Sequence, residues 1–172
     1  MNTFQAALLT IFPALMIIAA LTDATSFTIP NRISLLLLVA FPVTALALRL
    51  PMGEIGLNLG VGLGALVAGM AMFAAGWIGG GDAKLFAMAG LWLGWPAAAD
   101  FLMVTALAGG GLAILLLNAR SATVRAHLSG APGWLDRLTT PGADVPYGVA
   151  IAAGALAAYP QSALMHGFHG AF

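Results

Sequence analysis

Two aspartates are the residues of this chain best able to do chemistry. Asp23 directly follows a long apolar stretch, and Asp82 follows Gly79, Gly80 and Gly81 at the start of another. An ionised carboxylate costs free energy close to a bilayer, so an acid kept there is a candidate functional residue. Glycine adopts backbone conformations closed to other residues and lets another segment come close. We therefore expect the three glycines to make room beside Asp82.

Two carboxyl groups that face each other can act as an acid–base pair. Like charges a few ångströms apart cannot both ionise easily, so such a pair shares one proton. The ionised member takes a proton from water while the protonated member polarises a peptide carbonyl, and such proton transfer contributes about 10²–10⁴-fold to a rate. The chain contains no cysteine, which excludes thiol catalysis. We also find no serine–histidine set with an orienting acid.

Residue chemistry alone leaves three functions open. The pair would be catalytic in a protease, and it would bind a proton or cation in a small membrane transporter. In a scaffold subunit of a secretion machine, Asp82 would cap a helix beside Lys84 and Asp23 would anchor a helix at the interface. A transporter predicts activity without any chain cleavage, whereas a scaffold tolerates Asp→Asn at both positions.

Composition places the chain in a membrane. Of its 172 residues, 61% are hydrophobic and 7% are charged, and the mean hydropathy is +0.99; a soluble domain has about 25% charged residues. We expect one integral membrane domain over residues 1–172 and no cofactor or metal. Zero net charge and the lack of a basic run argue against nucleic acid as a partner. The apolar N-terminal run lacks a basic flank, so we expect a span rather than a cleavable signal.

The apolar runs predict an all-α bundle of six transmembrane helices. The glycines Gly56, Gly60 and Gly64 recur every four residues, and we expect another helix to pack closely against them. Trp92 and Trp95 are expected in an interfacial belt. The predicted spans are 3–22, 33–50, 55–78, 83–97, 99–118 and 146–165, and a polar loop with a short interfacial helix occupies 119–145.

The positive charges orient this bundle. With six spans, the loops 23–32, 79–84 and 119–145 share one side, and they carry five of the six basic residues. Lys and Arg concentrate on the cytoplasmic side of membrane proteins. We therefore expect both aspartates to face the cytoplasm and both termini to lie outside. The five basic residues on that side are Arg32, Lys84, Arg120, Arg125 and Arg137, against Arg49 on the other.

Three ordered motifs carry a resemblance to a known family. They are "DATSFTIPNRIS" (23–34), "GGGDAKLFAMAGLWLG" (79–94) and "VPYGVAIAAGAL" (145–156). Gly79 to Asp82 fit the GxGD signature of membrane aspartyl proteases, and all three motifs together resemble prepilin peptidases in order and spacing. The resemblance covers essentially the whole chain and is closest to the short form that serves Flp, or tight-adherence, pili.

The resemblance implies a function for the aspartate pair. Asp23 and Asp82 would be catalytic residues of a GxGD-type fold in the bacterial inner membrane, cutting on the cytoplasmic side. The implied substrates are prepilins and pilin-like proteins, which have a short basic leader ending in glycine and then a hydrophobic helix. Longer members carry a segment with paired cysteines that is associated with N-methylation. This chain has no cysteine, so we expect peptidase activity without methyl transfer; whether it forms a homo-oligomer stays open.

Other residues are expected to support or compete with the pair. Asn31 either adds a hydrogen bond to the site or only starts a helix with Pro30, and Lys84 either favours the ionised Asp82 or meets lipid phosphate. Three residues, Pro146, Tyr147 and Gly148, open the last span on the same side; the Tyr147 hydroxyl either reaches the site or lies in an aromatic belt.

Two further acids and the loop arginines belong to the same side. Asp136 and Asp144 share the polar loop and are the competing acids, with docking of a basic leader as their expected role. The loop arginines Arg120, Arg125 and Arg137 are expected to meet anionic lipid headgroups.

Overall fold

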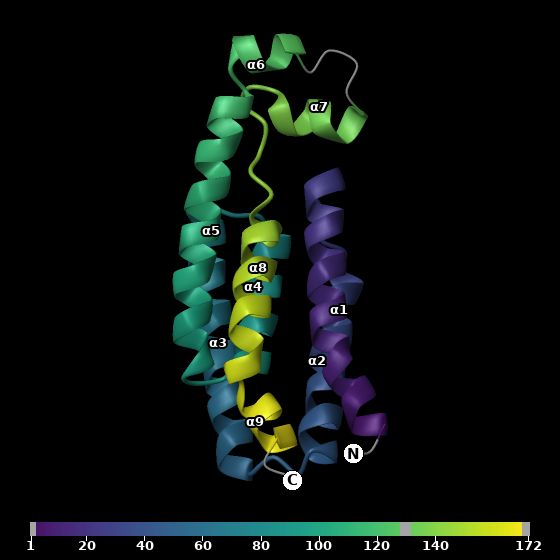
Figure 1. Cartoon of the computed structure of the whole chain (residues 1–172). Helices are drawn as coiled ribbons and strands as arrows, with labels where there is room; N and C mark the ends of the chain where they lie inside the picture. The colour runs from purple at the N-terminus through teal and green to yellow at the C-terminus, as the bar shows by residue number, and fades with distance from the viewer. Residues whose placement is uncertain (1–2, 128–131, 170–172) are drawn as a thin grey trace.

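The protein is an elongated bundle of helices (Figure 1). The computed structural model describes residues 3–127 and 132–169, and all regular structure within them is helical. This confirms the all-α prediction. The six principal helices are α1 (Thr3–Ser26), α2 (Asn31–Ala47), α3 (Met52–Ala74), α4 (Gly80–Leu93), α5 (Ala97–Ala119) and α8 (Tyr147–Ala158).

Short helices lie at the two ends of the bundle. Between α5 and α8, the polar segment contains α6 (Ala122–His127) and α7 (Gly133–Thr139) at the upper end in Figure 1. After α8, a 3₁₀ turn η1 (Tyr159–Gln161) leads into α9 (Ala163–His169) at the lower end. The segment predicted to hold one short helix thus contains two.

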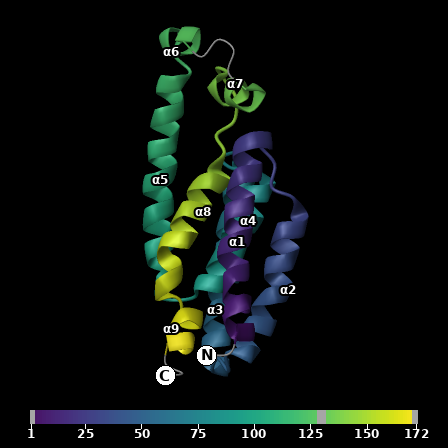
Figure 2. The same cartoon turned by 45° about the vertical axis from the view of Figure 1, so that its right-hand side comes forward.

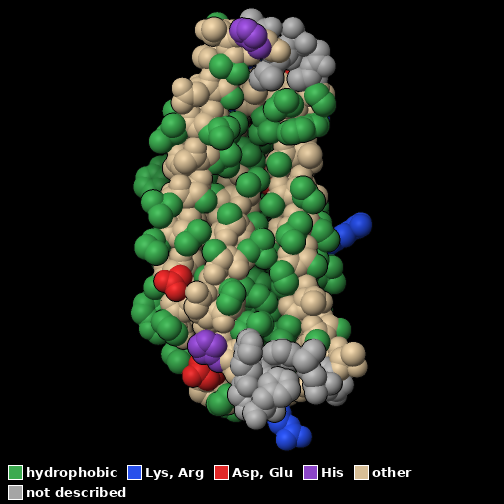
Figure 3. Space-filling view, viewed as in Figure 1, with side chains coloured by type: hydrophobic (Ala, Val, Ile, Leu, Met, Phe, Trp, Pro, Cys, Tyr) green, Lys and Arg blue, Asp and Glu red, His purple; other side chains and the backbone are tan. Residues whose placement is uncertain are grey.

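The long helices are apolar enough for a membrane. Within the described residues, four segments can cross one by length and composition: α1, α3, α5 and the stretch Tyr147–His166. On the face of the bundle seen in Figure 3, hydrophobic side chains are far more numerous than charged ones. These features indicate a multi-pass membrane protein. The helix α2 is a shorter apolar helix and α4 has only 14 residues, so the count of six spans stays a prediction.

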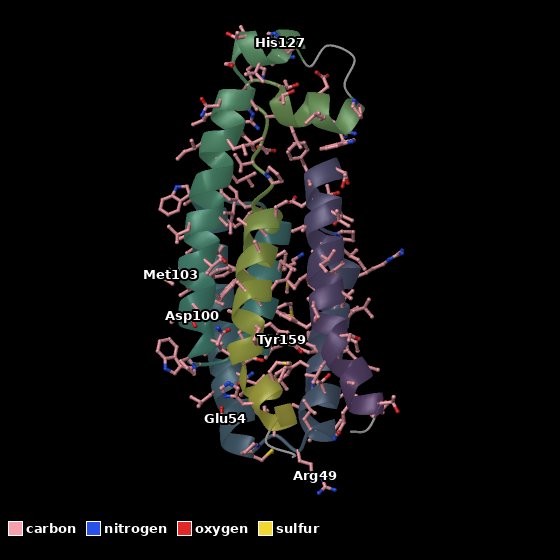
Figure 4. The ribbon with its side chains drawn as sticks, viewed as in Figure 1. Arg49, Glu54, Asp100, Met103, His127 and Tyr159 are labelled. Atoms are coloured by element: carbon pink, nitrogen blue, oxygen red, sulfur yellow. The ribbon has the colours of Figure 1, made fainter. Side chains whose placement is uncertain are left out.

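Alternating helix directions bring distant segments to one end. The C-terminal ends of α1, α3 and α5 lie at the upper end with the N-terminal ends of α2, α4 and α8 (Figures 1 and 2). Arg49 and Glu54 lie at the opposite, lower end, whereas His127 lies at the upper end (Figure 4). The regions around Asp23, Asp82 and residue 147 therefore meet, although they are far apart in sequence.

Glycines allow α3 to pack closely against α4, but they are not the glycines that the four-residue spacing predicted. A Cβ at Gly62 would lie 2.9 Å from the Leu91 Cβ, and one at Gly69 would lie 3.1 Å from the Ala83 Cα. By contrast, nothing lies within 4 Å of a Cβ added at Gly56, Gly60 or Gly64. The four-residue spacing was correctly seen as a helix face, but that face is exposed, and the packed glycines lie on another face.

An aromatic cluster fills the core between α1, α2 and α4. Trp92 is fully buried, stacks on Phe12 at a centroid distance of 5.2 Å, and donates a hydrogen bond to the Leu37 carbonyl. The Tyr159 hydroxyl donates to the Leu9 carbonyl in the same region. The interfacial prediction was therefore wrong for Trp92, because its indole N–H finds a backbone partner inside the bundle. Trp95 remains 60% exposed.

The packing difference between the two glycine faces can be tested by matched substitutions. Gly62→Leu should destabilise the bundle by about 1–3 kcal/mol, because the new side chain overlaps the backbone of α4. Gly60→Leu gains the same helix propensity but projects into open space, so it should leave stability unchanged. The measurement is the thermal unfolding midpoint in detergent. Equal midpoints for the two variants would contradict the described packing of α3 on α4.

Candidate active site

Asp23 is held in place by the start of α8. It lies in the last turn of α1 with 5% of its surface exposed, and its Oδ2 accepts a 2.7 Å hydrogen bond from the Gly148 N–H. A Cβ at position 148 would lie 2.8 Å from that same oxygen. Only glycine leaves room for this contact. Donor and acceptor are 125 positions apart in the chain, which is why sequence alone could not pair them.

Asp82 lies in the first turn of α4 and is bound to the segment before it. Its Oδ2 accepts a 3.0 Å hydrogen bond from the Gly79 N–H, and the residue is 7% exposed. The Asp82 carboxyl group interacts electrostatically with Asp23 and also with the Gly148 N–H. Its second oxygen, Oδ1, is buried without a hydrogen-bond partner among the described residues. That oxygen is enclosed by protein and has no polar contact in the described part of the chain to satisfy it.

Ile29 lies between the glycines of both motifs, and sequence reasoning missed it. A Cβ at Gly81 would lie 3.1 Å from the Ile29 Cβ, and one at Gly148 would lie 2.8 Å from the Ile29 Cδ1. Ile29 is 9% exposed and belongs to the connection from α1 to α2. Glycines at these two positions let α4 and α8 close on Ile29, which draws the two aspartates together.

Two cavities open on the aspartate pair. One, of about 220 Å³, is lined by both aspartates together with Tyr147, Asp144 and the segment 76–79. We call it the aspartate cavity. A second, of about 210 Å³, is lined by both aspartates, Gly79 to Gly81 and residues 27–29. The carboxyl groups therefore lie where two cavities adjoin.

The predicted supporting residues have different positions. Gly79 and Gly148 contact the aspartates directly, while Gly80 faces the Phe73 ring and Gly81 faces Ile29. The Tyr147 ring lines the aspartate cavity, although no hydrogen bond of its hydroxyl is seen among the described contacts. Pro30 and Pro146 immediately precede α2 and α8 as their N-cap residues.

Lys84 and Asn31 bind each other rather than the aspartates. The Lys84 Nζ donates a 2.8 Å hydrogen bond to the Asn31 Oδ1 in an exposed position. This contact joins the first turn of α4 to the first residue of α2. Neither side chain forms a hydrogen bond or ion pair with Asp82 among the described contacts. We therefore interpret the pair as a contact that holds α4 against α2 beside the site.

The polar segment above the bundle places its two acids differently. Asp136 lies 3.8 Å from Arg125 in an exposed ion pair, away from the aspartate cavity. Asp144 lines the aspartate cavity and is exposed. Arg120 donates hydrogen bonds to the carbonyls of Leu138 and Asp144. The Arg120 guanidinium thus binds backbone inside the polar segment, and its contact with lipid headgroups stays a prediction.

The arrangement can perform acid–base chemistry. Two buried carboxyl groups share one cavity, each with one oxygen held by a backbone N–H. Among the described residues, no group of three or more His, Cys, Asp or Glu is placed to hold a metal ion. The acids that line this cavity are the buried Asp23 and Asp82 and the exposed Asp144.

Comparison with protein families assigns the chain to a known family. The model of the type IV leader peptidase family matches residues 10–114, a range that contains both aspartates and all three glycines. The chain belongs to the type IV leader peptidase family. The resemblance to prepilin peptidases is thus confirmed at the level of the family.

A curated relative agrees with this assignment. The chain is 35% identical over 150 residues to a protein of Bacillus subtilis (strain 168) named prepilin leader peptidase/N-methyltransferase. The match covers 87% of this chain and 53% of the relative, so the chain spans about half of that protein's length. No solved structure matches the chain.

The proximity of the two aspartates can be tested without assuming any activity. Because the chain has no cysteine, the double variant Asp23→Cys/Asp82→Cys carries a single thiol pair. A short bifunctional thiol reagent should link the pair, and mass spectrometry of the digested protein would detect the linked peptides. Asp23→Cys/Asp100→Cys is the control, since Asp100 lies toward the lower end of the bundle (Figure 4). Equal linking in both variants, or none in the first, would refute the described site.

Proposed function

We propose that this protein is a membrane-embedded aspartyl endopeptidase that removes the basic leader from prepilins and pilin-like proteins. One observation carries the proposal: Asp23 and Asp82 come from different helices and meet at one cavity, each with a carboxylate oxygen that accepts a hydrogen bond from a backbone N–H. Membership of the type IV leader peptidase family supports the substrate class. Release of the leader would make the mature pilin available for pilus assembly.

The carboxyl pair supports hydrolysis through an activated water. The ionised aspartate takes a proton from a water between the pair, and the protonated aspartate donates its proton to the scissile carbonyl oxygen. The resulting tetrahedral diol then collapses: its C–N bond breaks, the leaving nitrogen takes a proton from one carboxyl group, and a diol hydroxyl returns a proton to the other.

The substrate must be extended where it is cut. A helical peptide uses its carbonyls in internal hydrogen bonds, and unpaired backbone at membrane depth is tolerated only where it lies in protein or in a water-filled cavity. The aspartate cavity supplies such a space, with Gly76 and Gly79 on its wall. Glycine at these positions keeps the wall free of side chains.

Charge supports a cytoplasmic active site in the bacterial inner membrane. Five of the six basic residues belong to segments at the end of the bundle that holds the aspartates, whereas Arg49 lies at the other end. By the positive-inside rule the aspartate end faces the cytoplasm, and the helix ends near residues 3 and 169 face outward. A basic leader held in the cytoplasm would then meet the pair without crossing the membrane.

Cleavage assays on aspartate variants test the proposed function. The protein is co-expressed with a candidate prepilin, and products are followed by gel shift and N-terminal sequencing. Wild type should cut after the leader glycine, and Asp23→Asn or Asp82→Asn should each lower the rate by about 10²-fold or more, since proton transfer contributes that much. Asp136→Asn is the matched control, because Asp136 pairs with Arg125 outside the cavity, and it should cut like wild type.

The outcomes separate the proposal from its alternative. Full cleavage by either Asp23→Asn or Asp82→Asn would rule out the acid–base pair. The alternative is a small transporter that uses the pair as a proton or cation site, which fits two buried carboxyls between two openings. It predicts no cleavage of any precursor by wild type, together with proton or cation flux in vesicles that Asp82→Asn abolishes.

The glycine that holds Asp23 provides a second test. Gly148→Ala would place a Cβ 2.8 Å from the Asp23 Oδ2 and from the Ile29 Cδ1, so the carboxyl group must move. Cleavage should fall by about tenfold or more, since a displacement costing 1.4 kcal/mol in the transition state already gives that factor. Gly64→Ala is the control because its Cβ meets open space. A Gly148→Ala protein that folds and cuts at the wild-type rate would show that the Asp23 contact is dispensable.

A further inference from the structure

A third cavity is an apolar groove on the side of the bundle. It has a volume of about 350 Å³ and lies between α3, α4, α5 and α8. Its wall on α5 consists mostly of small residues, which leave the helix backbone accessible. We call it the α5 groove, and its lining includes Phe86, Ala106, Gly109, Gly110, Ala113 and Ala150.

The α5 groove adjoins the aspartate cavity. Ile78 and Tyr147 line both, so these two residues form the border that the two spaces share. From Ala113 to Leu102 the groove follows α5 over about three helical turns, or roughly 16 Å at 1.5 Å per residue. It therefore leads from the aspartate end of the bundle toward its middle.

The aspartate cavity and the α5 groove differ in polarity, and this difference suits a substrate segment whose two halves differ in the same way. The aspartate cavity is bordered by the exposed Asp144, whose carbonyl is fixed by Arg120, and this acid attracts positive charge. The groove beyond Tyr147 is lined by apolar side chains apart from Thr105 and the tyrosine itself. A segment that is basic on one side of the pair and apolar on the other matches this order.

We propose that the α5 groove docks the apolar helix that follows the scissile peptide of the substrate. This inference rests on the proposed peptidase function and names where that substrate lies. The leader extends past Asp144, the scissile peptide lies between Asp23 and Asp82, and the helix descends along α5. Small residues let two helices approach closely in a membrane, where packing rather than water exclusion drives association.

Two neighbouring glycines allow a matched test. Gly110 lines the groove, whereas Gly111 does not, and a Cβ added at either meets nothing within 4 Å. Gly110→Leu should fill the groove without disturbing the protein's own packing, and cleavage of a full precursor should fall by about tenfold or more. Gly111→Leu makes the same change beside it and should cut like wild type.

A second substrate separates docking from damage to the site. A peptide that contains the leader and the scissile bond but lacks the apolar helix should be cut equally by wild type and Gly110→Leu. Equal loss on both substrates, or none on the full precursor, would overturn the groove assignment while the peptidase stands. If wild type cuts neither substrate, the proposed function itself fails, and the inference with it.

Photo-crosslinking identifies the occupant directly. Ala106→Cys, placed in the groove, and Leu107→Cys, which is 71% exposed outside it, are labelled with a thiol-reactive photo-crosslinker in an Asp82→Asn background. The precursor helix should be captured from position 106 at several times the yield from position 107. Capture of lipid alone from position 106 would mean that an acyl chain fills the groove, and would overturn the proposal.

Discussion

The hydrogen bond from the Gly148 N–H to Asp23 is the contact on which the site depends. It joins α8 to α1 across most of the chain at 2.7 Å, and it exists only because residue 148 has no side chain. Gly81 likewise leaves room on α4, so that Ile29 fits between α4 and α8. The helices α4 and α8 can therefore both approach the α1–α2 connection closely, because glycine has no side chain at either contact. A methyl group at Gly148 would press directly on the Asp23 carboxylate.

The two ends of the bundle differ in how tightly their side chains pack. Toward the lower end, the rings of Trp92, Phe12 and Tyr159 pack together. Trp92 and Tyr159 also donate hydrogen bonds to backbone carbonyls, which gives a rigid core. The aspartate end has small residues, two cavities and a buried carboxylate oxygen without a partner. Rigid packing at one end can hold the helices in register while the other end stays open to water and substrate.

Much of the candidate site was visible in the sequence because its signals are local. An acid beside a long apolar run is costly wherever the chain folds, so Asp23 and Asp82 were recognisable one at a time. The roles of Lys84 and Asn31 were not, because their partners depend on how α4 approaches α2. Ile29 carried no signal at all, since an apolar residue in an apolar chain is unremarkable until two glycines pack on it.

The sequence by itself determined the all-helical class, the membrane character and the pair of acids, because composition and apolar run length depend on neighbouring residues alone. The tertiary structure decided which glycines pack, which tryptophan is buried and what each acid faces. Gly60 and Gly62 differ by two positions on one helix, yet only Gly62 meets another helix. Every face of a helix in lipid can be apolar, so hydrophobic patterning does not distinguish the packed face from the lipid-facing one, and only the arrangement of the whole bundle does.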